Sequence, residues 1–180
     1  MKRIVLILTT LIAFIGVNSC SQEDVSKAIA DAIKNSFFQK DESLNFSYGS
    51  PVLSELNVTT RIIKVTDIGF VGNLNIKHSR VGDLQITLIK PDGTRLAIAR
   101  NNGGDGSINS LCIVDSDDYE SIATAVVVRE SECYKPIDSF SSIIGENPNG
   151  IWKLEIKDTV NNGKNGRFTG WGLSVFGKTE

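Results

Sequence analysis

The chain has 180 residues, of which 22% are charged and 41% hydrophobic, and its formal net charge at pH 7 is −2. This length is enough for one domain with one hydrophobic core and too short for two domains of ordinary size. The composition is that of an ordinary globular protein. Because the balance of charge is slightly acidic and no basic patch stands out, nucleic acid is excluded as an expected partner.

Residues 1–19 have the pattern of a secretory signal segment. A positively charged start precedes an apolar run over residues 4–17, which is too short to cross a membrane as a helix. The run leads to Cys20 through a segment that resembles a bacterial lipobox. The resemblance implies that Cys20 is lipidated and becomes the mature N-terminus, where several acyl chains would anchor the protein firmly. Cleavage by an ordinary signal peptidase is the alternative.

The segment after Cys20 is acidic and polar over residues 21–24, and it resembles the surface-export signal of some outer-membrane lipoproteins. We therefore expect a lipid-anchored protein of the bacterial outer membrane or cell surface. Disulfides persist in such compartments. With Cys20 assigned to lipid, Cys112 and Cys133 remain as an even pair, which predicts a disulfide between them. Two free, buried cysteines are the alternative.

Residues 22–40 carry apolar side chains every four positions from Val25 to Phe37, which predicts an amphipathic helix. Residues 41–51 are expected to be a linker. From Val52 onward the hydrophobic period changes to two, and Asp-Gly, Gly-Gly and Asn-Gly turn signals separate the short runs. This pattern predicts an all-β chain with an antiparallel sandwich. The expected parts are thus a signal segment (1–19), a lipidated N-terminus with helix and linker (20–51) and a β-sandwich (52–180).

The period-two runs also predict the core. Leu74, Ile76 and His78 share one face of a strand, and Trp152 and Trp171 each belong to the inward face of another. A further strand is expected over residues 122–128, after the longest polar loop, which spans residues 101–118.

Four segments together resemble the P domain (P/Homo B domain), the module that follows the catalytic domain of kexin- and furin-like proprotein convertases. The resemblance covers roughly residues 57–177 and implies a jelly roll of about eight strands, similar to galactose-binding domains. It also implies an accessory module, because the protease activity of that family resides in another domain. The segments are His78-Ser79-Arg80-Val81-Gly82-Asp83-Leu84, Lys90-Pro91-Asp92-Gly93-Thr94, residues 149–158 and residues 170–175.

His78 is the only histidine of the chain. Its place on the apolar face predicts a half-buried residue with satisfied hydrogen bonds, and the resemblance implies a structural role. Nothing like the nucleophile turn or the histidine motif of subtilisin-like domains is present, nor is an HExxH, P-loop or GxSxG motif. We therefore expect no peptidase activity.

Several aspartates lie at strand ends and in loops, where a calcium ion could collect six to eight oxygen ligands. The resemblance implies calcium at these loops, since bacterial P-domain-like modules often bind it there. Asp and Asn as ordinary turn residues are the alternative. The expected metal ligands are Asp83, Asp105, Asp117, Asp118 and Asp158.

Three functions are weighed. The leading hypothesis is a non-catalytic, envelope-anchored P-domain-like module, stabilised by calcium, that binds or assists a protease or another envelope protein. The second is a glycan-binding jelly roll of the cell surface, for which Tyr119 and Tyr134 are the candidate exposed aromatic residues in long loops. The third is a hydrolase that uses loop carboxylates.

Overall fold

The structure is a computed structural model of the chain, and it describes residues 21–34, 36–106, 108–130 and 132–179. The chain divides into two compact units, residues 1–34 and residues 35–180. The expected signal segment and Cys20 lie outside the described residues. Within the described part, no helix combines the length and the apolar character needed to cross a membrane.

In the first unit, the described residues form helix α2, Gln22–Lys34. A capping box starts this helix. The Ser21 hydroxyl accepts a hydrogen bond from the backbone N–H of Asp24, and the Asp24 carboxylate accepts one from the backbone N–H of Ser21. The predicted helix is therefore confirmed, but it ends at Lys34 and not at Lys40.

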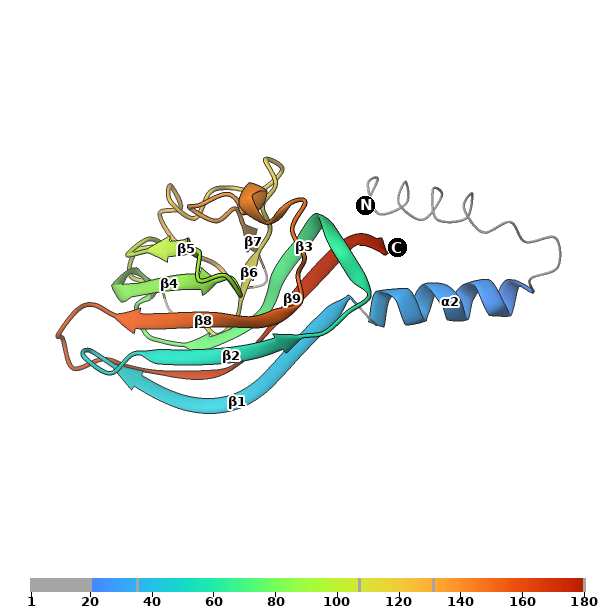
Figure 1. Cartoon of the computed structure of the whole chain (residues 1–180). Helices are drawn as coiled ribbons and strands as arrows, with labels where there is room; N and C mark the ends of the chain where they lie inside the picture. Colours follow the sequence, from blue (N-terminus) through green and yellow to red (C-terminus); the bar gives the residue numbers. More distant parts are fainter. Residues whose placement is uncertain (1–20, 35, 107, 131, 180) are drawn as a thin grey trace. The chain divides into compact units, whose positions relative to one another are not determined.

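The second unit is a sandwich of two β-sheets (Figure 1). The strand order is β1-β9-β3-β6-β7 in the five-stranded sheet and β2-β8-β4-β5 in the four-stranded sheet. Neighbouring strands are antiparallel except for β6 and β7. The predicted all-β, antiparallel sandwich is confirmed. The elements are β1 (Phe37–Ser47), β2 (Val52–Val58), β3 (Ile62–Lys77), η1 (Val81–Asp83), β4 (Leu84–Ile89), β5 (Arg95–Arg100), β6 (Leu111–Ile113), β7 (Cys133–Tyr134), η2 (Phe140–Ile143), β8 (Gly150–Asp158) and β9 (Asn165–Thr179).

Strand β1 occupies most of the expected linker, so the linker prediction over residues 41–51 is wrong. β1 is an edge strand that pairs with β9. Its inward positions alternate with exposed ones, but Lys40 and Glu42 fill two of the inward positions and form an ion pair at 3.3 Å. Charged side chains at inward positions of an edge strand hide the period-two pattern that identifies a strand.

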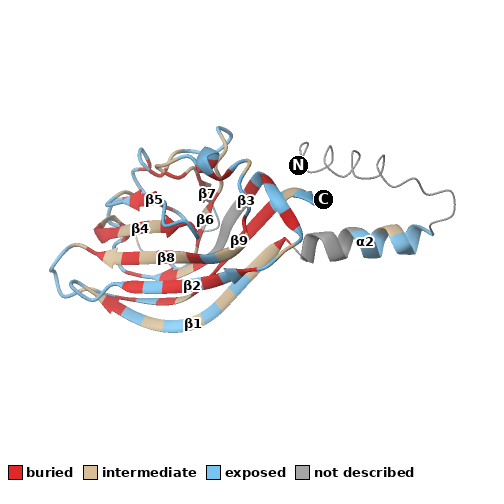
Figure 2. Ribbon diagram, in the orientation of Figure 1, coloured by how far each residue is buried: buried red, intermediate tan, exposed pale blue. Residues whose placement is uncertain are grey.

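Buried side chains of both sheets form one hydrophobic core, which Figure 2 shows as the red segments of the strands. Trp152 and Trp171 are buried, as their positions in the pattern predicted. Each indole N–H also finds an acceptor, the Pro148 carbonyl at 2.8 Å and the Ser54 hydroxyl at 2.9 Å. These satisfied polar groups allow two large side chains to pack in the interior.

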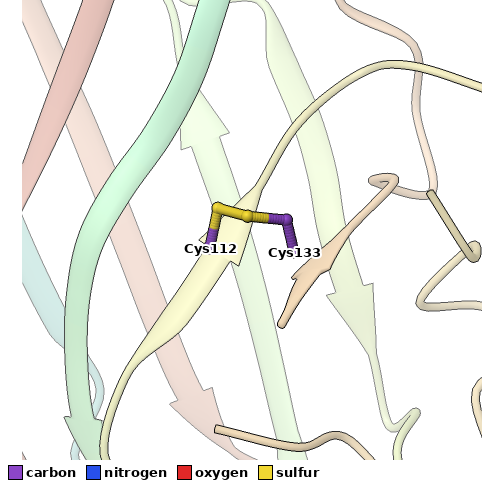
Figure 3. Close-up of a disulfide and its surroundings, with 2 residues drawn as sticks. All are labelled: Cys112 and Cys133. Atoms are coloured by element: carbon purple, nitrogen blue, oxygen red, sulfur yellow. A yellow bond between two sulfur atoms is a disulfide. The ribbon is translucent and has the colours of Figure 1, made fainter. Parts of the chain in front are cut away.

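A disulfide joins Cys112 of β6 to Cys133 of β7, as predicted (Figure 3). The expected strand over residues 122–128 is not formed, because this part of the chain is an irregular loop. Ile122, Ala125 and Val128 are buried at a spacing of three, while Val126 is 83% exposed. Three separate apolar anchors hold the loop on the core and override the β-propensity of its valines.

Tyr134, one of the two candidate exposed aromatic residues, is buried. It lies in β7, and its hydroxyl accepts a hydrogen bond from the backbone N–H of Arg129 and donates one to Glu132. Burial, opposed by the hydrogen bond from Arg129, raises the pKa of the Tyr134 hydroxyl. Tyr119, in contrast, is exposed.

Candidate functional site

The turn from β3 to β4 places His78 and Asp83 at one rim of the sandwich. His78 follows β3 and exchanges two backbone hydrogen bonds with Ile108, at 3.2 and 3.1 Å. The chain then passes through η1, where the Asp83 N–H donates to the Arg80 carbonyl at 3.2 Å. Because β3 and β4 belong to different sheets, this turn connects the two layers of the sandwich.

Asp158 reaches the same rim from the end of β8. It pairs with Leu84, the first residue of β4, and so lies beside Asp83. The N–H and the hydroxyl of Thr159 both donate to the Asp83 carbonyl at 2.9 Å, which fixes the two strand ends together. The side chains of His78, Asp83 and Asp158 converge here, with potential ligand atoms within 4.8 Å of one another. We call these three buried residues the rim cluster.

The two carboxylates of the rim cluster differ in how well they are paired. The Asp83 carboxylate contacts Arg80 Nε at 3.1 Å through Oδ1 and accepts a hydrogen bond from Asn162 Nδ2 at 2.8 Å through Oδ2. The Asp158 carboxylate accepts one hydrogen bond on Oδ1, from the backbone N–H of Val160 at 3.0 Å. Its Oδ2 is buried and has no hydrogen-bond partner. This oxygen faces Nε2 of His78 at 3.6 Å, which is too long for a hydrogen bond.

His78 is fully buried and not half-buried as predicted, and only one of its ring nitrogens has a partner. Nδ1 lies 2.7 Å from the carbonyl oxygen of Arg80 and 3.2 Å from the backbone nitrogen of the same residue. The Phe46 ring stacks on the imidazole, with 5.8 Å between ring centroids. Nε2 makes no hydrogen bond. Sequence reasoning assigned His78 to the core and missed its place beside the carboxylates. The available signal was the short spacing between His78 and Asp83 across a turn.

The glycine-rich loop brings Asp105 near the rim cluster. Arg80 Nε contacts the carboxylates of Asp105 and Asp83, at 3.0 and 3.1 Å. The loop lies close to the turn, since the Gly82 N–H donates to the Gly104 carbonyl at 3.0 Å. A Cβ on residue 82 would lie 2.7 Å from that oxygen, so the approach requires glycine. Asp105 is 82% exposed and is joined to the rim cluster only through Arg80.

The remaining expected ligands lie in a second group of aspartates, residues 115–118, which we call the acidic loop. Asp117 pairs with Lys135, and this hydrogen bond and the lysine charge lower the pKa of Asp117. Asp118 accepts a hydrogen bond from the Ser116 hydroxyl at 3.2 Å. Asp115 accepts two, from the Phe140 N–H and the Ser139 hydroxyl. Neither Asp117 nor Asp118 belongs to the rim cluster.

The rim cluster has the donor set of a cation site. Among the described residues it is the only group of three His, Cys, Asp or Glu side chains with this mutual proximity. One imidazole and two carboxylates fit calcium poorly, because calcium takes six to eight oxygen ligands. Calcium binding by Asp83, Asp105, Asp117, Asp118 and Asp158 stays a prediction. The side chains of His78 and Asp158 have no exposed surface, so a substrate does not meet them in this conformation.

The chain is similar to one protein family and to two solved structures. The profile of the proprotein convertase P-domain matches residues 70–175, a stretch that contains the whole rim cluster. Two crystal structures are similar: the serine protease of Aeromonas sobria in complex with its chaperone (21% identity, TM-score 0.48) and that protease alone (19% identity, TM-score 0.46). The alignments cover 87% and 86% of this chain and 30% of each protease chain. No curated protein matches.

The profile match extends over more than half of the chain. It begins within β3, at residue 70, and ends within β9, at residue 175. It coincides with the part of the sandwich that contains the disulfide and the rim. The chain belongs to the proprotein convertase P-domain family.

Proposed function

We propose that this chain is a non-catalytic P-domain module, anchored in the bacterial envelope, that binds or assists a protease partner. The observation that carries the proposal is the family match over residues 70–175, because P domains accompany the catalytic domains of proteases. The chain spans only 30% of the length of the two protease chains to which it is similar. The proposed partner is a protease on a separate chain.

The burial of the rim cluster supports a non-catalytic role. A general acid or base must come within hydrogen-bond reach of the substrate proton that it transfers. His78 is the only histidine of the chain, and its side chain and that of Asp158 are fully shielded from solvent. We expect the purified protein to leave peptide substrates intact. Turnover that disappears in a folded His78→Ala variant would contradict this proposal.

The two alternative functions receive less support. A glycan site needs exposed aromatic platforms. Trp152, Trp171 and Tyr134 are all buried, which leaves Tyr119 as the exposed member of the two loop candidates. A hydrolase that uses two carboxylates needs them to flank an accessible cleft. The buried carboxylates of Asp83 and Asp158 do not meet this requirement, and those of the acidic loop are engaged by protein groups.

The membrane anchor rests on the sequence of the first 20 residues. Mass spectrometry of the protein extracted from membranes should show an acylated Cys20 at its N-terminus. A soluble mature protein that starts at another residue would contradict the anchor and leave the P-domain assignment unchanged.

The partner is tested with a purified subtilisin-like serine protease of the same organism. We expect the two proteins to elute as one complex in size-exclusion chromatography, and the protease to lose activity more slowly on heating when the chain is present. Separate elution and an unchanged half-life of the protease would contradict the proposal.

Surface variants locate the contact without disturbing the core. Leu53 of β2 and Ile151 of β8 are both about half exposed. Val126 is exposed in the loop between β6 and β7. Leu53→Lys with Ile151→Lys tests the outer face of the four-stranded sheet. Val126→Lys is the control for one added lysine at a loop position, to be compared with each of the two single variants.

A further inference from the structure

Two buried polar atoms of the rim cluster face each other without a hydrogen bond. Nε2 of His78 and Oδ2 of Asp158 are 3.6 Å apart, and neither side chain has exposed surface. Among the described residues, these are the only buried side-chain nitrogen or oxygen atoms that lack a partner. Unpaired buried polar atoms are rare in native proteins, and a missing ion is one of the few explanations for them.

The other ring nitrogen indicates how His78 is oriented. Nδ1 lies 2.7 Å from the Arg80 carbonyl oxygen and 3.2 Å from the Arg80 backbone nitrogen, and the shorter contact is a hydrogen bond if Nδ1 carries the proton. Nε2 then has a free lone pair directed at the Asp158 carboxylate, which is also an acceptor. A cation between them satisfies both. Metal-binding histidines have this arrangement, in which the second ring N–H donates to a carbonyl or carboxylate oxygen.

The distance between the two atoms also fits a shared ion. Nitrogen and oxygen ligands at about 2.0–2.2 Å from a tetrahedral metal lie roughly 3.4 Å from each other. The 3.6 Å separation is close to this value and too long for a direct hydrogen bond. Asp83 completes a set of three donors within 4.8 Å, and its second oxygen can keep the hydrogen bond from Asn162.

The charges around the rim cluster match one divalent cation. Asp83, Asp105 and Asp158 each carry one negative charge, and Arg80 contributes one positive charge through its contacts with Asp83 and Asp105. With a neutral His78 these groups sum to −2. Asp105 is 82% exposed, so the buried negative charge lies on Asp83 and Asp158, and buried charge without a partner is strongly unfavourable.

We propose that His78, Asp83 and Asp158 bind a divalent transition metal ion of the zinc class. Imidazole nitrogen is a favoured ligand of zinc and related ions, whereas calcium is bound by oxygen. The three protein ligands leave at least one position for water. Surface hollows of about 960 and 380 Å³ are lined in part by His78 and Asp158, respectively.

The bound ion would join the two layers of the sandwich. His78 follows β3 of the five-stranded sheet, while Asp83 and Asp158 lie at the ends of β4 and β8 in the four-stranded sheet. An ion that binds ligands from both sheets holds the two sheets together at the rim. Metal binding then stabilises the folded state, because the unfolded chain does not hold the three ligands together.

The test uses the full chain after treatment with chelator, melted alone and with zinc, manganese or calcium. We expect zinc to raise the melting midpoint by several degrees and to bind with one-to-one stoichiometry. Asp158→Asn should abolish both effects, since it removes a ligand charge and keeps the side-chain shape. The matched control Asp117→Asn, in the acidic loop, should respond to zinc as the native chain does. A shift with calcium alone, or with no metal, would overturn the proposal.

A second measurement protects the test against a variant that fails to fold. Cobalt(II) added to the metal-free native chain should give the visible absorption of a low-coordinate site, and zinc should displace it. The same spectrum as cobalt in buffer would overturn the proposal whatever the stability of Asp158→Asn. If Asp158→Asn is folded by circular dichroism and still binds one equivalent of zinc, the assignment of the site is wrong.

Discussion

The rim cluster and the acidic loop both contain aspartates, but these aspartates differ in their burial and in their hydrogen-bond partners. In the acidic loop, neighbouring aspartates along the chain each find their own protein partner, and Asp117 is 94% exposed. In the rim cluster, residues that are 75 positions apart in the sequence, Asp83 and Asp158, meet in the interior beside His78, and one oxygen remains unpaired. The density of carboxylates in the sequence therefore does not identify the buried carboxylates that the fold brings together.

The difference follows from topology. Strand ends of one sheet lie side by side, so a residue that ends β8 and one that precedes β4 are neighbours whatever their separation in the chain. A loop such as residues 115–118 lies against solvent and can turn each carboxylate toward a nearby N–H, hydroxyl or lysine. Buried carboxylates lack this freedom, so they depend on fixed partners.

The largest effect should come from removing the histidine of the rim cluster. His78→Ala leaves the Asp158 carboxylate buried without its neighbour and removes the stack with Phe46. Truncation of a large, fully buried side chain to alanine leaves a cavity and costs about 2–5 kcal/mol. Urea unfolding in metal-free buffer measures the change, with Asp117→Ala as the control from the acidic loop. Equal losses in the two variants would remove the distinction between the two regions.

The next largest effect should come from removing the disulfide that encloses the acidic loop. Replacement of Cys112 and Cys133 by serine opens a loop with a sequence separation of 21 residues, which chain-entropy estimates value at about 3 kcal/mol. We expect lower stability together with faster proteolysis between residues 114 and 132. Equal urea midpoints for the double variant and for the native, oxidised chain would contradict this expectation.

A smaller loss of stability should follow from displacing the Phe46 ring, which stacks on His78. A Cβ at Gly166 would overlap the Phe46 ring, so Gly166→Ala must displace the ring from its stack. Overpacking of this kind costs about 1–3 kcal/mol. Gly106→Ala is the control, because its nearest new contact is the half-exposed Val127 side chain at 3.2 Å. Thermal melts compare the two, and a larger loss in Gly106→Ala would show that Phe46 does not support the rim.

The smallest effect is expected at Asp117, and it depends on pH. The hydrogen bond and charge of Lys135 lower the pKa of Asp117, so the pair adds stability above the unfolded value of about 3.9. This stability disappears as the pH falls through the lower folded pKa. Asp117→Asn should therefore be slightly less stable than the native chain at neutral pH and equal to it in acid. A difference that grows on acidification would have the wrong sign.

Much of the sandwich could be predicted from the sequence, because its inward positions alternate. Leu74, Ile76, Trp152 and Trp171 are buried as the pattern indicated. The pattern failed where local chemistry departs from it. Lys40 and Glu42 fill inward positions of β1, so the alternation that identifies a strand is hidden there and the pattern predicts a linker. The valines of residues 126–128 favour a strand, but only Val128 is buried, and the segment forms a loop.

The site could be predicted only in part. The positions of Asp83 and Asp158 at strand ends suggested that they meet at one rim, and the structure places them there. The separation of this pair from Asp117 and Asp118 depends on how long loops fold, which the sequence pattern does not contain. The participation of His78 was missed because alternation indicates which face a side chain occupies and not what lies beside its polar atoms.

The most direct measurement uses the fact that the chain has one histidine. In a nitrogen-15-labelled sample, the long-range proton–nitrogen correlations of the imidazole belong to His78 without further assignment. The account predicts a proton on Nδ1, none on Nε2, and a change in the Nε2 resonance that saturates at one equivalent of zinc. A ring that carries its proton on Nε2 and is unchanged by zinc would contradict the metal site at the rim.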